Sequence, residues 1–309
     1  MSNLNKIVTG EGSPPIVGQV AGKRQAVGNA PIAPAPYEGF LGAPKCHPRF
    51  TKGDAATRKK RRQCVSDSEL AKATGAPLTR NLRQELAAKT RCQLTDERCI
   101  LESAGTTAAK QLLASALRPA KPADWDSDPD QWLDNKNIEL VLKQYADIYP
   151  WFRFYGVHPI DFSAPSPYIK DHRECLIPKM CSIEIPKLRA EGVKYGGVVF
   201  NLDNHLGKGT HWVALIIDTN EKKPGVFYFD SYGMKPPKQV RRFMEDLAYE
   251  EPRAIFGYNG RRFQYSNSEC GMYSILFIIC MMHGVPFSKF VKRPIADKYM
   301  LALRDWVFS

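Results

Sequence analysis

The sequence lacks a hydrophobic run long enough to cross a membrane, since its longest apolar stretch, within residues 264–284, falls short of the about 20 residues that a spanning helix needs. It also lacks an N-terminal secretory signal peptide. Closely spaced C-x2–4-C pairs, which structural zinc sites commonly use, are absent as well. We therefore expect no membrane span, no bound metal and no cofactor.

The cysteines also lack the regular spacing that is typical of a disulfide framework. The eight cysteines are irregularly spaced, at positions 46, 64, 92, 99, 175, 181, 270 and 280. Disulfide-dense domains belong to oxidising compartments, and nothing in this spacing indicates one. We expect free thiols and a reducing compartment rather than secretion.

Net positive charge is nearly absent from the C-terminal part and concentrated in the N-terminal part. Residues 1–122 carry 20 Lys and Arg against 9 Asp and Glu, whereas the remaining residues carry 24 against 23, which together give the net charge of +12. The segment Thr57–Gln63 (TRKKRRQ) is typical of a nucleic-acid contact or a nuclear address. A run of this kind is also compatible with plain solvated charge, so DNA or nucleoprotein contact stays one of two interpretations.

Composition divides the 309 residues into three segments. Residues 1–65 are basic and rich in Pro and Gly, with few large apolar side chains, and they predict a partly disordered tail. Residues 66–122 show helical spacing and open with a capping box at Ser66–Glu69, which predicts a basic helical arm domain. Residues 123–309 predict a larger domain with an ordinary charge balance.

The larger domain contains both helical and strand patterns. Strands are predicted at residues 197–201, 211–218 and 225–230. An amphipathic helix over 236–249, a short strand and a helix from Cys270 that is apolar on every side follow them. This order indicates an α+β fold with a central mixed, mostly antiparallel sheet and one buried helix.

Cys270 opens the buried helix. Asn267 and Ser268, just before it, are residue types that cap helix starts. Free N–H groups and the helix dipole at this end stabilise an anion, which favours a thiolate, and the polar loop before the helix is expected to admit solvent. Cys270 alone is equally compatible with a buried structural cysteine.

A cysteine nucleophile needs a base, a group that orients the base and a donor for the oxyanion. His211 begins one predicted strand and Asp230 ends the next, so hairpin pairing places the imidazole beside the carboxylate. Gln264 lies six residues before Cys270, where its amide can reach an oxyanion. The sequence thus offers all four groups on neighbouring elements.

Three motifs, GTHWVAL, YFDSYG and Q-x5-C-G, together resemble the SUMO-protease and adenovirus-endopeptidase superfamily of cysteine proteases. The resemblance covers about residues 195–285. It implies a papain-like, circularly permuted core in which His211, Asp230, Gln264 and Cys270 are catalytic. It also implies that Trp212 lines a narrow channel for small substrate residues, and we expect Asn267 and Ser268 to contact substrate.

The upstream segment 141–162 (VLKQYADIYPWFRFYGVHPIDF) and the basic arm resemble the polyprotein-processing proteases of large DNA viruses, of the African swine fever virus type. The resemblance implies a cysteine endopeptidase that cleaves after Gly-Gly in viral core polyproteins during virion maturation. It would act in the virion and the host cytoplasm (virus factory), with the host nucleus as a further location. The alternatives are a SUMO or ubiquitin-like deconjugase and a nucleic-acid-binding protein on an inactive protease scaffold.

Other residues of the same types are expected to play no catalytic part. His205 lies in a polar loop and Asp218 lies at the far end of its strand from His211. Cys280 lies nearly three turns into the buried helix, and His283 is expected to cap its end. His158, among apolar neighbours, is expected in the core.

Overall fold

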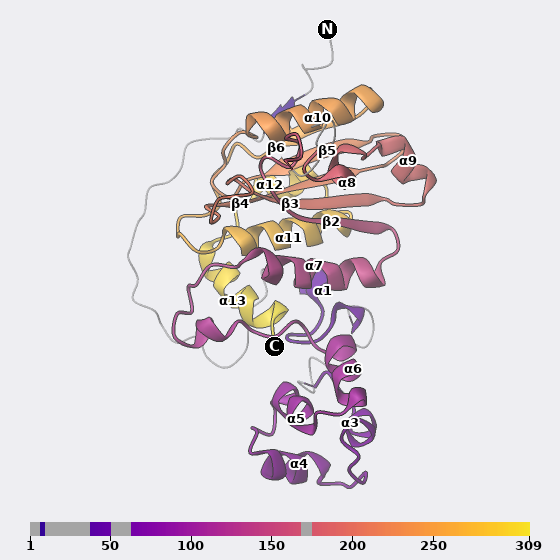
Figure 1. Ribbon diagram of the computed structural model, residues 1–309, viewed down its shortest axis with the longest axis vertical. Coiled ribbons are helices and arrows are strands. Elements are labelled where there is room, and N and C mark those ends of the chain that lie inside the picture. Colours follow the sequence, from indigo (N-terminus) through magenta and orange to yellow (C-terminus); the bar gives the residue numbers. More distant parts are fainter. Residues whose placement is uncertain (1–6, 10–37, 51–62, 168–174) are drawn as a thin grey trace. The chain divides into compact units, whose positions relative to one another are not determined.

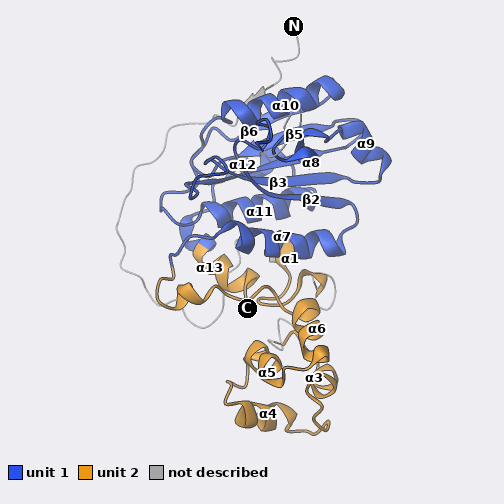
Figure 2. Cartoon of the chain, viewed as in Figure 1, with its two compact units in different colours: residues 1–32, 130–300 blue, residues 33–129, 301–309 orange. Residues whose placement is uncertain are grey.

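The computed structural model describes residues 7–9, 38–50, 63–167 and 175–309 (Figure 1). The chain forms two compact units (Figure 2). Unit 1 comprises residues 1–32 and 130–300, and unit 2 comprises residues 33–129 and 301–309. The sequence predicted a boundary after residue 122, whereas the units divide after residue 129 and assign the last nine residues to the arm unit.

A mixed sheet forms the centre of unit 1. In the described residues it has six strands in the order β1-β6-β5-β4-β3-β2. The strands are β1 (Ile7–Thr9), β2 (Phe152–Pro159), β3 (Tyr195–Asn201), β4 (Trp212–Asp218), β5 (Gly225–Phe229) and β6 (Ile255–Tyr258). The three strands expected from alternation correspond to β3, β4 and β5.

The sheet is mixed, as predicted, but parallel pairings outnumber antiparallel ones. β3 pairs with β4 and β4 with β5 in antiparallel fashion, while β1–β6, β5–β6 and β2–β3 are parallel. The expectation of a mostly antiparallel sheet is therefore wrong. The aromatic segment that contains β2 was not assigned as a strand, and strand β1 lies within the predicted tail.

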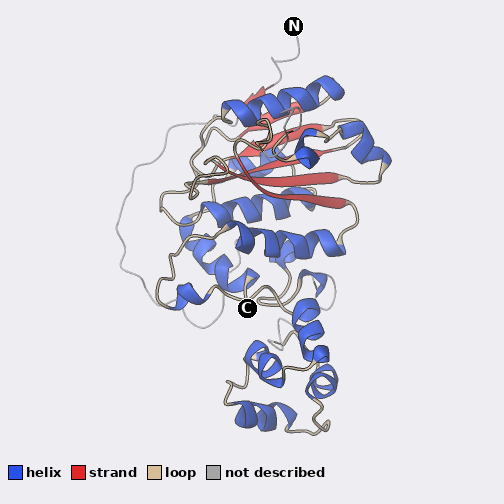
Figure 3. Ribbon diagram, viewed as in Figure 1, coloured by secondary structure: helices blue, strands red, loops and turns tan. Residues whose placement is uncertain are grey.

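Helices cover both faces of the sheet (Figure 3). On one face, α8 (Pro178–Cys181), α9 (Ile185–Ala190) and α10 (Lys238–Glu250) pack onto alternate residues of β3, β4 and β5. On the other face, α7 (Asn135–Ile148) packs on β2, and α11 (Cys270–Met282) packs on β3 and β4. The short helix α12 (Phe287–Lys292) follows α11.

Helix α11 is buried along its whole length, as its all-round apolar sequence predicts. Every residue from Cys270 to Met282 is buried. Within the described residues, no helix combines the length and apolar character needed to span a membrane. Packing against the sheet on one side and α7 on another accounts for the apolar surface of α11.

Unit 2 is built mainly of helices. They are α1 (Glu38–Leu41), η1 (Pro48–Phe50), α3 (Asp67–Thr74), α4 (Leu82–Thr90), α5 (Glu97–Ala104), α6 (Thr107–Ala116) and η2 (Ala123–Asp126), and α13 (Asp297–Val307) ends in this unit. The predicted capping box is confirmed, with Ser66 and Glu69 bonded reciprocally at the start of α3. Leu41, Cys46 and Phe50 are buried, so part of the segment predicted as a tail packs in this unit.

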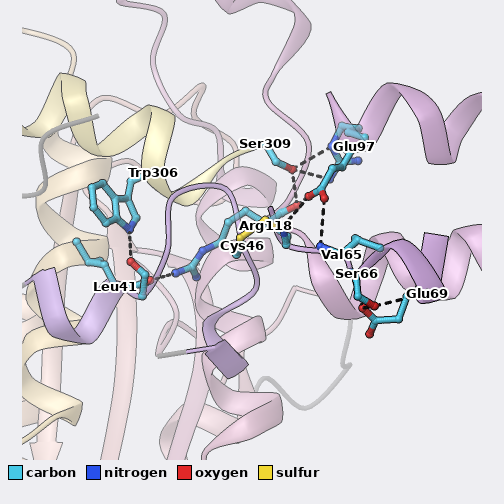
Figure 4. Close-up of a disulfide and its surroundings, with 12 residues drawn as sticks. Leu41, Cys46, Val65, Ser66, Glu69, Glu97, Arg118, Trp306 and Ser309 are labelled. Carbon is cyan, nitrogen blue, oxygen red and sulfur yellow. Dashed lines mark hydrogen bonds between the residues drawn. A yellow bond between two sulfur atoms is a disulfide. The ribbon is translucent and has the colours of Figure 1, made fainter. Parts of the chain in front are cut away.

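Six of the eight cysteines form disulfides, which corrects the expectation of free thiols. The pairs are Cys46–Cys64, Cys92–Cys99 and Cys175–Cys181, with sequence separations of 18, 7 and 6. Figure 4 shows the Cys46–Cys64 region, where the Glu97 carboxylate accepts hydrogen bonds from the backbone N–H groups of Cys64 and Val65. Such irregular separations carry no recognisable pattern in sequence, because folding rather than spacing brings the partners together.

Replacing both Cys46 and Cys64 by serine should lower the free energy of unfolding of unit 2 by about 3 kcal/mol, because the cross-link closes a loop of 18 residues in the unfolded chain. The matched variant Cys92→Ser with Cys99→Ser opens a loop of only 7 residues and should cost about 2 kcal/mol. Denaturant unfolding without reductant measures both. Unchanged stability in the first double variant would contradict this account.

Candidate active site

The antiparallel pairing of β4 and β5 brings His211 and Asp230 together. His211 immediately precedes β4 and Asp230 immediately follows β5, and Ala214 pairs with Phe229. The His211 Nε2 atom lies 2.8 Å from Asp230 Oδ1. Both side chains are buried, with relative exposures of 9% and 1%. The adjacency that the sequence predicted for these two residues is therefore present.

Cys270 is the first residue of α11 and forms a hydrogen bond with the His211 side chain. Since His211 Nε2 faces Asp230, Nδ1 is the ring nitrogen left for the sulfur. Cys270 is only 2% exposed, although the sequence predicted a solvent-accessible thiol. Gln264 and Glu269, in the loop before the helix, are themselves fully buried.

The surroundings of His211 favour its protonated form. Burial alone would lower the pKa of this imidazole, but hydrogen bonds and charge from Asp230 and Cys270 outweigh burial and raise the pKa to about 9. At neutral pH the ring is then an imidazolium. An imidazolium at this position can donate a proton to a leaving group.

Gln264 is held with its amide in a fixed orientation. The Ser231 hydroxyl donates to Gln264 Oε1 at 2.6 Å, and Gln264 Nε2 donates to the Ser266 carbonyl at 2.8 Å. The backbone N–H of Gln264 also donates to the Ser231 carbonyl at 2.8 Å. One N–H of the amide is thus engaged, and the second remains available to a developing oxyanion.

Comparison with known proteins finds a family match in the same part of the chain. Residues 198–308 match the Ulp1 protease family, C-terminal catalytic domain, and this range contains all four residues discussed above. This region belongs to the Ulp1 protease family. Within the matched range the four groups follow one another in the order His211, Asp230, Gln264 and Cys270.

The relatives with similar sequences are viral proteases. A protein of Acanthamoeba polyphaga mimivirus, named as a thiol protease, is 32% identical over 187 residues, which cover 59% of this chain and 58% of the relative. The SUMO-1 cysteine protease of African swine fever virus (isolate Pig/Kenya/KEN-50/1950) is 28% identical over 185 residues, covering 57% of this chain and 67% of the relative. The chain thus spans little more than half of the mimivirus protein.

Structural similarity extends over most of the chain. The crystal structure of the African swine fever virus protease superposes with a TM-score of 0.63 at 21% identity, covering 86% of this chain and 95% of that chain. At this identity the similarity supports the fold alone. This chain and that protease therefore share an α+β fold, which here has a mixed sheet and a buried helix that begins at Cys270.

The three residues expected at the substrate channel have different surroundings. The Trp212 indole is 8% exposed and donates from Nε1 to the Leu133 carbonyl at 2.8 Å. Asn267 is exposed, and the half-buried Ser268 donates to the Glu269 carboxylate at 3.0 Å. Neither caps α11, because the capping residue is Glu269 and no side chain makes a cap hydrogen bond. Their contact with substrate stays a prediction.

Several residues that the sequence did not single out hold the four groups in place. Asn259 donates to the Asp230 carbonyl at 2.6 Å and accepts from its backbone N–H at 2.9 Å. Asp297 accepts from the backbone N–H groups of Tyr265 and Ser266 at 2.9 and 2.8 Å, which anchors the loop that carries Gln264. Since β6 runs parallel to β5, Asn259 at its end could be predicted beside Asp230 once β6 is placed.

Two glycines allow close approaches at the site. Gly233 has φ of +76°, and a Cβ there would lie 2.7 Å from the Arg261 carbonyl carbon, so only glycine fits the turn after Asp230. A Cβ on Gly271 would lie 3.0 Å from Leu133 Cδ1. The glycines of the YFDSYG and C-G motifs are thus explained by packing.

The rival residues lie where the sequence placed them. His205 is exposed and pairs with Asp161 at 2.7 Å, and Asp218 pairs with Gly225 at the opposite end of β4 from His211. Cys280 is fully buried, and burial raises the pKa of its thiol well above the usual value. His283 caps the end of α11 and His158 is buried in β2, as predicted.

Replacing Gln264 by alanine should reduce kcat about 10²- to 10³-fold with little change in KM, because an oxyanion donor acts on the transition state. Replacing Ser231 by alanine leaves the amide present but removes the hydroxyl that orients it, so a smaller loss of about tenfold is expected. Steady-state kinetics on the same peptide measure both. Equal losses in kcat for the two variants would argue against Gln264 as the donor.

Proposed function

We propose that this protein is a cysteine endopeptidase that cleaves after small residues, of the Gly-Gly-X type, in structural polyproteins of a DNA virus during virion maturation. The proposal rests on one observation. The His211 ring forms a hydrogen bond with the Asp230 carboxylate at 2.8 Å and another with the Cys270 side chain. The viral proteases with similar sequences support the viral setting.

The proposed reaction follows from this geometry. The Cys270 thiolate attacks the carbonyl carbon, and the Gln264 amide donates to the oxyanion. The His211 imidazolium gives its proton to the leaving nitrogen, so the C–N bond breaks and a thioester forms. Water then loses a proton to His211 and attacks the thioester, which releases the acid product and restores the thiolate. Asp230 holds the ring orientation in both halves.

The preference for glycine is supported by how little of the site is exposed. Cys270, Trp212 and His211 are 2%, 8% and 9% exposed. A substrate must therefore present its carbonyl to the sulfur along a narrow path, and glycine has no side chain to collide with the walls. Gly-Gly before the scissile bond meets this requirement with the least bulk.

Two substrates separate the endopeptidase from a deconjugase. The SUMO-1 protease name of the African swine fever virus relatives keeps deconjugation as a second candidate. The purified chain should cut a core polyprotein fragment that contains Gly-Gly-X faster than a SUMO conjugate. Faster release of SUMO would instead favour the deconjugase.

Nucleic-acid binding on an inactive scaffold is the third candidate, and the basic N-terminal region motivates it. The run Thr57–Gln63 lies outside the described residues apart from Gln63. This candidate requires salt-dependent DNA binding that is lost when residues 58–62 are replaced by glutamine, together with no labelling by a Gly-Gly vinyl electrophile. Labelling at Cys270 would rule it out as the sole function.

The proposed sites of action are the virion and the host cytoplasm (virus factory), with the host nucleus as a further location if the basic run acts as an address. Immunofluorescence of the chain in infected cells tests this assignment. Exclusion of the protein from both virions and cytoplasmic factories would contradict it.

A further inference from the structure

Arg262 is exposed on unit 1, and its guanidinium packs against two aromatic rings. Its guanidinium carbon is 5.2 Å from the centre of the Tyr232 ring and 4.8 Å from the centre of the Tyr265 ring. Tyr265 is 61% exposed, so this cluster of Tyr232, Arg262 and Tyr265 is open to solvent. Contacts with both rings restrict the motion of the guanidinium, so that less conformational entropy is lost when a partner binds it.

The cluster contacts the candidate catalytic groups at two points. The Tyr232 ring stacks on the His211 ring at 4.7 Å, and Arg262 Nε donates to the Gln264 carbonyl at 2.6 Å. Because the imidazole and the guanidinium carbon lie 4.7 and 5.2 Å from the same Tyr232 ring centre, they are no more than about 10 Å apart. That distance corresponds to about three residues of extended chain.

Within the part of the chain that the structure describes, Arg262 takes part in no ion pair, and its two terminal amino groups have no hydrogen-bond acceptor. Other arginines of unit 1 differ, since Arg153, Arg189 and Arg253 each bind a glutamate. A planar fork of free donors, held at Nε and against two rings, matches the geometry of a carboxylate.

We propose that Arg262 is a specificity-determining residue that binds an acidic side chain of the substrate, within the first three residues on the leaving side of the scissile bond. The leaving side is inferred from His211, because its ring must reach the leaving nitrogen to donate a proton. The Tyr232 ring stacks on His211 and also contacts Arg262, so Arg262 lies on that side. The inference rests on the proposed peptidase function.

Matched peptides test the inference. They share one Gly-Gly acyl part and carry Glu or Gln at the first, second or third residue of the leaving part, and a further pair carries Glu or Gln upstream of Gly-Gly. At low salt the wild-type chain should prefer Glu about tenfold in kcat/KM at one leaving-side position, because a charge-assisted bidentate contact is among the stronger hydrogen bonds. The preference should shrink at high salt.

The Arg262→Gln variant should lose the preference, with a Glu/Gln ratio near one. The ratio compares two substrates on one enzyme, so a general loss of activity through the Gln264 contact does not affect it. Arg241→Gln, which changes an exposed arginine on α10, should keep the wild-type ratio.

The outcomes separate the two proposals. Cleavage with equal rates for Glu and Gln, a preference only upstream of Gly-Gly, or a preference retained in Arg262→Gln would each overturn the role of Arg262 and leave the peptidase function standing. Failure to cleave any of the peptides would contradict the proposed function and the inference with it.

Discussion

Cys270→Ala is expected to abolish peptidase activity, with a fall in kcat of at least about 10⁴-fold and no change of fold. The thiol is the only proposed group that bonds to the substrate carbon, and alanine removes it without adding bulk at the buried start of α11. Loss of peptide cleavage, measured beside an unchanged thermal unfolding profile, checks the expectation.

Cys280→Ala is the matched control. It makes the same chemical change in the same buried helix, but its thiol has a pKa raised well above the usual value by burial. Full activity in Cys280→Ala beside none in Cys270→Ala would assign the nucleophile. Substantial turnover by Cys270→Ala would remove Cys270 from that role.

The disulfides sharpen this prediction. All eight cysteines lie in the described residues, six are paired, and Cys270 and Cys280 are the two free thiols. A slender Gly-Gly electrophile should therefore modify the folded chain at one position, with one equivalent consumed. Labelling at Cys280, or at two positions without reductant, would contradict the assignment of reactive thiols.

The hairpin that carries His211 and Asp230 was predictable because its signals are local. Two apolar segments joined by a short polar turn imply antiparallel pairing, and the register then places the start of one strand beside the end of the next. Helix α11 was predictable for a similar reason, since a helix that is apolar all round has to be buried. Local pattern and burial together locate the centre of the site.

Parallel neighbours were harder to predict from the sequence. β2 joins β3, and β6 joins β5, across long connections that carry no turn signal. Without β6, the position of Asn259 against Asp230 is invisible, although it forms two buried hydrogen bonds there. The side chains that support the site depend on these long-range pairings more than the four reacting groups do.

Supporting contacts from distant segments escaped prediction for the same reason. Asp297 reaches back over 30 residues to the loop that carries Gln264, and Ser231 crosses 33 residues to orient its amide. The disulfides show the same limit, because their partners follow no spacing rule. The residue types in the sequence indicate which chemistry is possible, whereas these long-range contacts show how the reacting side chains are kept in position.

Asp230→Asn is expected to move the alkaline limb of the pH–rate profile to lower pH and to reduce kcat by on the order of 10²- to 10³-fold at neutral pH. His211 must be protonated to serve the leaving nitrogen, and its pKa of about 9 puts the wild-type fall in activity near that pH. Asparagine keeps the shape of the side chain but removes its charge. The lowering effect of burial on the pKa of His211 is then less opposed, so this pKa falls.

The same change has a signature in stability. Because the folded pKa of His211 is raised from 6.5 to about 9, its contribution is fully present below pH 6.5 and is lost as pH rises through about 9. Wild-type unfolding free energy should therefore fall by a few kcal/mol over this window, and Asp230→Asn should flatten the fall. Asp218→Asn, at the far end of β4, is the matched control and should leave both profiles in place. An alkaline limb that stays near pH 9 in Asp230→Asn would show that the carboxylate does not set the protonation of His211.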